Sequence, residues 1–183
     1  LIEHSGVINK LVNFKEDIEF TPDYRFTLLA SYAFDASIGQ MFMPLCKGCP
    51  LFLLPKEQQN DPDSFWNFMF ENKVNVIYTA ASFLNPMLDT PRDLKDLEVK
   101  AVFLGAEAFP LPLLKKIRKK LRADYIVNMY GPTETTVNCV MHTVKGTPEK
   151  SIPLGKPLPN YTAYVLDADL NVCPVGVPGE IHI

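Results

Sequence analysis

Short apolar runs alternate with segments of helical periodicity through the first 130 residues of the chain. The apolar runs are bounded by turn residues and predict buried strands over residues 26–30, 50–54, 74–78, 100–104 and 125–127. Before and between them, apolar residues recur three and four positions apart, which predicts helices over residues 1–14, 38–45, 61–69, 82–88 and 111–121. Strands that alternate with helices in this way predict βαβ units, and near-continuous apolar strands are typical of parallel sheets covered on both faces. We therefore expect an α/β fold with an open, mostly parallel sheet flanked by helices; an α+β arrangement is the alternative.

Local signals define the ends and faces of several predicted helices. Ser5 is the expected N-cap of the first helix, and Pro62 between two acidic residues marks the start of the third. Residues 17–23 are polar and form the expected connection to the first strand. In the second helix the residues at the spacing of one apolar face are Ile38, Met41, Phe42 and Leu45, and in the third they are Phe65, Phe68 and Met69.

The character of the chain changes after Thr136. Residues 138–144, 161–166 and 179–183 are β-like and are separated by turns rich in proline and glycine. We expect a small, incomplete β region after the α/β core, with residues 1–144 as the first unit and residues 145–183 as the start of the second. The chain has no initiator methionine or basic leader and stops inside a β-like run, so both ends are expected to be cuts in a longer polypeptide.

Composition argues against two classes of partner. Of the 183 residues 47% are hydrophobic and 21% are charged, and the net charge of −3 gives no basic footprint for nucleic acid. No run approaches the roughly 20 apolar residues of a membrane span. The basic run 115–120 lies late in a predicted helix, where a solvated face is expected and a binding patch is the alternative. We expect a cytoplasmic protein without nucleic-acid or membrane partners.

Two of the four cysteines, Cys46 and Cys49, have the C-x-x-C spacing of a metal half-site or a redox pair. No second pair with zinc spacing exists, and the three histidines are isolated in the sequence. Cys46 fits the apolar face of a helix and Cys49 fits the entry to the next strand. Buried, reduced thiols are therefore expected, with the metal or redox site as the alternative.

Polar and small residues follow four of the predicted strands, in segments 34–37, 78–82, 105–108 and 128–136. In open parallel sheets, ligands bind outside the carboxyl ends of the strands, so these segments predict one ligand site. The hydroxyl groups and the carboxylate of the last segment suit a phosphate and its Mg²⁺. The alternatives are a helix cap for Asp35, a solvated loop acid for Glu107 and an ordinary polar loop for residues 133–136.

Five motifs in order resemble those of the adenylation domains of non-ribosomal peptide synthetases, within the adenylate-forming ligase superfamily. Phe34-Asp35-Ala36-Ser37 is similar to their F-D-x-S motif, and residues 128–134 are similar to N-x-Y-G-P-T-E. Gly105-Ala106-Glu107 is similar to their G-G-E turn, with alanine in place of the second glycine. Residues 152–157 and 176–181 resemble the segments that follow. The resemblance covers essentially the whole chain.

This resemblance implies activation of an amino acid by ATP to an aminoacyl-adenylate, followed by transfer to the phosphopantetheine thiol of a carrier domain. The implied partners are a peptidyl carrier domain and a condensation domain of the same assembly line. Thr133 and Glu134 are the implied catalytic residues, with Thr133 on the α-phosphate and Glu134 on Mg²⁺. Tyr130 is expected to stack on adenine and Asn128 to bond its edge. The other implied nucleotide-side residues are Gly105, Ala106, Glu107 and Gly131.

The resemblance also implies an amino-acid pocket. Asp35 is expected to pair with the substrate's α-ammonium, because an unpaired buried carboxylate is costly. The side-chain pocket maps onto Ala36, Gly39, Tyr78, Phe103, Gly105, Met129, Val137 and Asn138. These residues favour a sizeable, largely apolar or aromatic side chain, and Asn138 is the polar exception that allows one hydrogen-bonding group.

The family's phosphate loop, ribose-binding aspartate and catalytic lysine are absent from these 183 residues, so the chain is expected not to turn over alone. A non-catalytic nucleotide- or partner-binding module of the same fold is one alternative function. An acyl-CoA or aryl-acid ligase is another, although neither of its substrates would need the ammonium anchor at Asp35.

Overall fold

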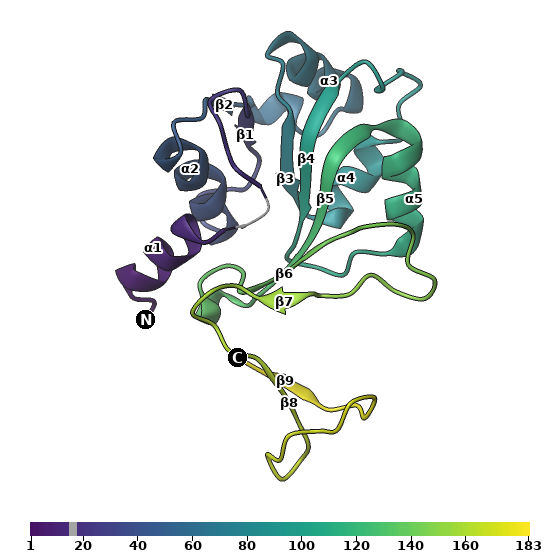
Figure 1. Cartoon of the computed structure of the whole chain (residues 1–183). Helices are drawn as coiled ribbons and strands as arrows, with labels where there is room; N and C mark the ends of the chain where they lie inside the picture. The colour runs from purple at the N-terminus through teal and green to yellow at the C-terminus, as the bar shows by residue number, and fades with distance from the viewer. Residues whose placement is uncertain (15–17) are drawn as a thin grey trace.

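The chain folds around one seven-stranded sheet with helices on both faces (Figure 1). The computed structural model describes residues 1–14 and 18–183, so Asp17 of the predicted connection lies outside the described residues. The strand order is β2-β1-β3-β4-β5-β6-β7, in which β1 to β5 are parallel to one another, β6 is antiparallel to β5, and β7 is antiparallel to β6. The strands are β1 Phe26–Leu28, β2 Leu51–Leu53, β3 Val76–Thr79, β4 Glu98–Leu104, β5 Arg122–Tyr130, β6 Val140–Thr143 and β7 Lys156–Pro157. The predicted open, mostly parallel α/β sheet is confirmed.

Two layers of helices enclose the sheet and create a core on each face. Helices α1 and α2 lie on one side and α3, α4 and α5 on the other (Figure 1). Strand β4 contributes to both cores in alternation, because Val102 and Leu104 face α3–α5 whereas Ala101 and Phe103 face the opposite side. The helices are α1 His4–Val12, α2 Ala36–Cys46, α3 Pro62–Glu71, α4 Ala81–Met87 and α5 Leu111–Lys120, with short 3-10 turns η1 Lys56–Gln58 and η2 Thr133–Thr135.

Helix α3 begins where the sequence predicts, whereas the predicted cap of α1 is wrong. Asp61 is the N-cap of α3, and its carboxylate accepts a hydrogen bond of 2.8 Å from the backbone N–H of Ser64. In α1 the N-cap is Glu3, and Ser5 already lies inside the helix, where its hydroxyl donates to the Glu3 carboxylate at 3.2 Å. The helix begins at His4, two residues further toward the N-terminus than a Ser5 cap allows.

The apolar face of α2 is not its buried face. Phe42 is 47% exposed and Leu45 is 56% exposed, whereas the residues buried toward the sheet are Ser37, Gly39, Gln40, Met43 and Pro44. The small and polar side of the helix is held against the sheet because Gln40 bonds backbone groups there, as described below. Strand β2 is similarly less buried than predicted, with Leu53 69% exposed, because it is the edge strand of the sheet.

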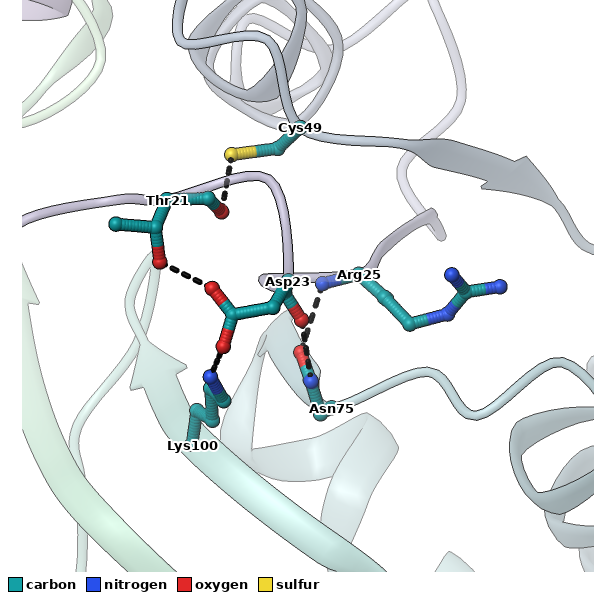
Figure 2. Close-up of polar contacts among 6 residues, drawn as sticks. All are labelled: Thr21, Asp23, Arg25, Cys49, Asn75 and Lys100. Carbon is teal, nitrogen blue, oxygen red and sulfur yellow. Dashed lines mark hydrogen bonds and ion pairs between the residues drawn. The ribbon is translucent and has the colours of Figure 1, made fainter.

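A polar cluster fixes the amino ends of the strands, at the edge of the sheet opposite their carboxyl ends (Figure 2). The Asp23 carboxylate accepts a hydrogen bond from the Thr21 hydroxyl and pairs with Lys100 of β4. The Asn75 amide accepts from the backbone N–H of Arg25 at 2.7 Å and donates to the Asp23 carbonyl at 2.8 Å. Because these bonds join residues far apart in sequence, they hold the segment before β1 against β3 and β4.

The last part of the chain forms a separate two-stranded antiparallel sheet of β8 Tyr164–Leu166 and β9 Glu180–His182, which projects from the main body (Figure 1). Strand β7 still belongs to the large sheet, where it pairs with β6. The predicted small β region after the core is confirmed. The division of the chain between residues 144 and 145 stays a prediction.

The cysteines are free thiols, and Cys46 is exposed rather than buried as predicted, because it lies on the outward face of α2. Cys49 and Cys139 are buried, and burial raises the pKa of both thiols. Within residues 1–14 and 18–183, no group of three or more histidine, cysteine, aspartate or glutamate side chains could hold a metal ion. In the same ranges, no helix has the length and apolar character that a membrane crossing requires.

Candidate functional site

Two neighbouring cavities open at the carboxyl ends of the parallel strands. The large cavity, of about 820 Å³, is lined by residues 106–112, 128–132, 150–152 and Leu154. The small cavity, of about 540 Å³, is lined by residues 29–31, 34–36, 78–80, 105–106, 131–133 and 137–138 together with Gln40, Phe83 and Met129. Ala106, Met129, Gly131 and Pro132 line both cavities and form a shared wall. The predicted edge of the sheet therefore carries two adjacent cavities.

Most residues predicted for the amino-acid pocket line the small cavity: Asp35, Ala36, Tyr78, Gly105, Met129, Val137 and Asn138. Gly39 and Phe103 do not. Phe103 is fully buried behind the wall and packs against Phe14, with ring centroids 5.2 Å apart. A Cβ at Gly39 would lie 2.9 Å from the Tyr78 hydroxyl oxygen, so this glycine allows the tyrosine its place rather than lining the cavity itself.

Asp35 faces the site instead of capping its helix. It occupies the N-cap position of α2 but makes no side-chain capping bond, and its carboxylate accepts a hydrogen bond of 2.6 Å from the Thr133 hydroxyl. The alternative role as a helix cap is therefore wrong for this side chain. Asp35 is half-buried rather than buried, so the carboxylate is accessible from the small cavity.

Five of the seven residues predicted for the nucleotide line the large cavity, namely Ala106, Glu107, Asn128, Tyr130 and Gly131. The other two, Gly105 and Thr133, line only the small cavity. The buried amide of Asn128 donates to the Pro153 carbonyl at 2.9 Å, which leaves the amide oxygen as an acceptor. The Glu107 carboxylate accepts from the backbone N–H of Ser82, at the start of α4. This hydrogen bond joins the loop after β4 to α4, and a negative charge at a helix N-terminus is favourable. Glu107 is therefore more than a solvated acid.

Backbone geometry constrains the shared wall at two positions. A Cβ at Gly131 would lie 2.5 Å from the Asn138 Cα and 2.8 Å from the Cys139 nitrogen, so only glycine allows β5 to approach β6 this closely. Ala106 has a φ of 66°, a left-handed conformation that favours glycine. Alanine therefore occupies a strained backbone position at the place where the related motif has its second glycine.

The loop that follows Gly131 is strained just before Asn138, which lines the small cavity. Thr136 and Val137 both have positive φ, of 64° and 73°. The Asn138 backbone N–H donates to the Thr136 carbonyl at 2.9 Å, which together with the φ of Val137 describes a γ-turn of the rare, strained type. Strained backbone of this kind is typical of functional sites, and here it involves a β-branched residue.

Glu134 lies in η2, is exposed and lines neither cavity. Mg²⁺ in nucleotide sites is commonly bound through one or two carboxylates together with phosphate oxygens and water. A single exposed carboxylate beside Thr133 fits that donor set.

Two buried polar residues that the motifs do not include, Lys10 and Gln40, form hydrogen bonds to groups around the small cavity. The Gln40 side chain accepts from the backbone N–H groups of Leu29 and Ala30, both at 2.8 Å, and donates to the Tyr78 carbonyl at 3.0 Å. It thereby joins the ends of β1 and β3 beneath the small cavity. Its burial could have been inferred only from the packing of α2.

Lys10 reaches the site from α1 and is fully buried. Its ammonium donates to the side-chain oxygen of Asn138 and lies 5.0 Å from the centroid of the Phe14 ring. Burial lowers the pKa of Lys10 from 10.5 to about 7, although the negative charges of Asp35 and Cys139 act in the opposite direction. Burial also raises the pKa of the Tyr78 phenol, and the nearby Asp35 charge raises it further.

Comparison with known proteins identifies the family. The model of the AMP-binding enzyme family matches residues 1–183. One component of the plipastatin synthase of Bacillus subtilis (strain 168) is 33% identical over 186 residues, and the match covers all of this chain and 7% of that protein. Tyrocidine synthase 1 of Brevibacillus parabrevis is 33% identical over 188 residues, covering all of this chain and 16% of that protein. The chain thus spans only a small part of these relatives.

Solved structures agree with this assignment. The nonribosomal peptide synthetase FmoA3 superposes with a TM-score of 0.91 at 26% identity, over 98% of this chain and 20% of that chain. The four-domain nonribosomal peptide synthetase AB3403, solved with AMP and glycine, gives a TM-score of 0.87 at 30% identity, over 98% of this chain and 13% of that chain. The chain therefore belongs to the AMP-binding enzyme family, and it is an adenylate-forming domain of the kind found in nonribosomal peptide synthetases.

Proposed function

We propose that this chain supplies the amino-acid site and the adenine site of an enzyme that activates an amino acid with ATP. In this reaction a carboxylate oxygen of the amino acid attacks the α-phosphorus of ATP, and the bond to pyrophosphate breaks. The product is an aminoacyl-adenylate. The observation that carries the proposal is the pair of cavities with a common wall, because the two substrates must lie side by side for this attack.

The amino acid would occupy the small cavity, with its α-ammonium on Asp35. This carboxylate is accessible from the cavity, and its described hydrogen bond comes from a neutral hydroxyl, so a cation would be a stronger partner. A fatty or aryl acid offers no such cation. Asp35 therefore favours amino-acid activation over the related acyl-CoA or aryl-acid reaction.

The nucleotide would occupy the large cavity. The amide oxygen of Asn128 can accept from the adenine amino group, and the half-buried ring of Tyr130 offers a stacking surface at the same wall. Thr133 would donate to the α-phosphate. Glu134 would hold Mg²⁺, which would neutralise phosphate charge when bound. A related FmoA3 structure holds AMPPNP, which supports the use of ATP.

The acyl group would then pass from AMP to the phosphopantetheine thiol of a peptidyl carrier domain, forming a thioester and releasing AMP. A condensation domain would consume that thioester. Both partners are proposed because the relatives named above are peptide synthases and one of them has four domains.

Amino-acid-dependent exchange between ATP and pyrophosphate tests the function. The whole protein is assayed with the common amino acids and with several aryl acids, and one or a few amino acids are expected to support exchange. Asp35→Ala is expected to lower kcat/KM for the preferred amino acid at least about 100-fold, the scale of a lost charge-assisted bond at about 3 kcal/mol. Asp96→Asn, an exposed aspartate outside both cavities, is the matched control and should leave exchange unchanged.

Exchange that depends on an aryl acid would show a different ligase of the same superfamily. Exchange that keeps its amino-acid dependence in Asp35→Ala would refute the proposed role of Asp35 as the partner of the substrate's α-ammonium. Nucleotide binding without exchange for any acid would instead support a non-catalytic binding module.

A further inference from the structure

A buried cation lies behind the wall of the small cavity. Lys10 is fully buried on α1, and its ammonium donates to the side-chain oxygen of Asn138, which lines the cavity. No carboxylate among the described residues forms an ion pair with Lys10. A buried cation without an ion-pair partner is costly, so the hydrogen bond from Lys10 to Asn138 is its most informative contact with the described residues.

This contact fixes the orientation of the Asn138 amide. When Lys10 is protonated, its ammonium group carries only donors, so it meets the amide oxygen rather than the NH₂ group. The Tyr78 hydroxyl lies 3.4 Å from the same oxygen and can donate to it as well. Rotating the amide by half a turn would place its N–H bonds against the ammonium. The amide nitrogen therefore points away from Lys10.

The amide nitrogen of Asn138 has no partner within residues 1–14 and 18–183, although it is buried. A buried donor without a partner costs about 1–3 kcal/mol. Asn138 is only 3% exposed, and its backbone is held by the strained turn at Val137 and by the close approach of Gly131. Several constraints thus maintain an unsatisfied donor in the wall of a ligand cavity.

We propose, on the basis of the proposed function, that Asn138 selects an amino acid whose side chain carries a hydrogen-bond acceptor, a carbonyl or carboxylate oxygen. The amide N–H of Asn138 donates to this oxygen. Lys10 is a positioning residue, because its ammonium holds the amide in the orientation that presents N–H. The amide nitrogen is buried, so binding includes a side-chain adjustment of the kind common at binding sites, which exposes this N–H to the cavity that Asn138 lines.

The test compares amino acids of similar size that differ in the acceptor. With the whole protein, kcat/KM for ATP–pyrophosphate exchange is measured for asparagine against leucine and for glutamine against methionine. The acceptor-bearing member of at least one pair is expected to be favoured about 10-fold or more, which corresponds to one net hydrogen bond. Exchange supported only by apolar amino acids, or equally by both members, would overturn the inference.

Asn138→Asp replaces the N–H donor by an acceptor of the same shape, and the new carboxylate can pair with Lys10 so that the fold is kept. The preference for the acceptor-bearing amino acid is expected to disappear or reverse. An unchanged preference would refute the role of Asn138. Asn138→Leu serves as a second variant. It is expected to lose the preference for the acceptor-bearing amino acid without reversing it.

Lys10→Met and Lys10→Gln form a matched pair for the positioning role. Methionine fills the space without a donor, whereas glutamine keeps a donor for the Asn138 oxygen without a charge. The ratio of kcat/KM within an amino-acid pair is expected to fall toward one in Lys10→Met and to be largely kept in Lys10→Gln. This ratio is insensitive to a uniform loss of folded enzyme. If both variants keep the wild-type ratio, Lys10 does not position Asn138.

Failure of this inference is distinguishable from failure of the proposed function. Exchange without selectivity for an acceptor overturns the inference alone. Absence of exchange with every amino acid overturns the function on which it rests.

Discussion

Replacing Lys10 by methionine should stabilise the folded chain at and below neutral pH. Lys10 is fully buried, and burial lowers its pKa from 10.5 to about 7. At about 1.4 kcal/mol per pKa unit, the protonated form destabilises the fold by up to about 5 kcal/mol relative to the neutral form. Methionine loses the hydrogen bond to Asn138, at about 1–2 kcal/mol. We therefore expect Lys10→Met to be about 3 kcal/mol more stable than wild type at pH 6.

The pH dependence distinguishes this effect from an ordinary packing change. Between pH 7 and 10.5 the unfolded chain holds a proton on Lys10 that the folded chain has released, so wild-type stability gains from Lys10 as pH rises. Below pH 7 both states are protonated and the destabilisation is complete. The advantage of Lys10→Met should consequently shrink by about 2–3 kcal/mol between pH 7 and pH 9.

The assay is urea unfolding of both proteins at several pH values between 6 and 9, followed by circular dichroism. Taking the difference between variant and wild type cancels the titration of groups that do not interact with Lys10, such as Cys49. Lys95→Met, at an exposed lysine, is the control and should give a difference that does not vary with pH. A flat difference for Lys10→Met would refute a lowered lysine pKa.

Three further substitutions test other parts of the site. Gly131→Ala should destabilise the chain by at least about 2 kcal/mol in urea unfolding, because its Cβ would lie 2.5 Å from the Asn138 Cα; Gly48→Ala, where φ is 70° and nothing lies within 4 Å, should cost only about 1 kcal/mol. Ala106→Gly should raise the free energy of unfolding by up to about 1 kcal/mol, since it relieves a φ of 66°; a marked loss of stability would contradict the strain. Gln40→Leu should cost about 2–4 kcal/mol, as it leaves three backbone groups without their partner, and hydrogen exchange should show faster opening of the loop after β1.

The sequence predicts the architecture well where one local pattern dominates. Apolar strands and intervening helices imply the parallel sheet, and the rule that ligands bind at the carboxyl ends of its strands brings Asp35, Asn128 and Thr133 to one edge before any coordinates are known. Strand β5 shows the limit of the pattern. The apolar run predicts residues 125–127, whereas the strand spans Arg122–Tyr130, because polar residues such as Asn128 interrupt an apolar run without interrupting the backbone ladder.

What the sequence could not predict depends on tertiary packing. Helix α2 has a well-defined apolar face, yet the side around Gln40 is buried, because three backbone hydrogen bonds hold that side against the sheet. Lys10 falls at i+3 from Val7 and i−4 from Phe14, so it would share a face with apolar residues in the predicted helix over residues 1–14. That spacing is the available signal for burial. Its contact with Asn138, 128 positions away, requires the docking of α1.

The Thr133 hydroxyl has a single hydrogen. It donates this hydrogen to the Asp35 carboxylate, at an oxygen–oxygen distance of 2.6 Å. A phosphate that accepts it would take it from the carboxylate, and an ammonium arriving at Asp35 would supply a replacement. Each substrate would therefore ease the entry of the other. Thermodynamic reciprocity makes this effect equal in both directions, and a charge-assisted bond of about 1.5–3 kcal/mol sets its upper limit at roughly 10- to 150-fold in affinity. One shared hydrogen would then couple the two halves of the site.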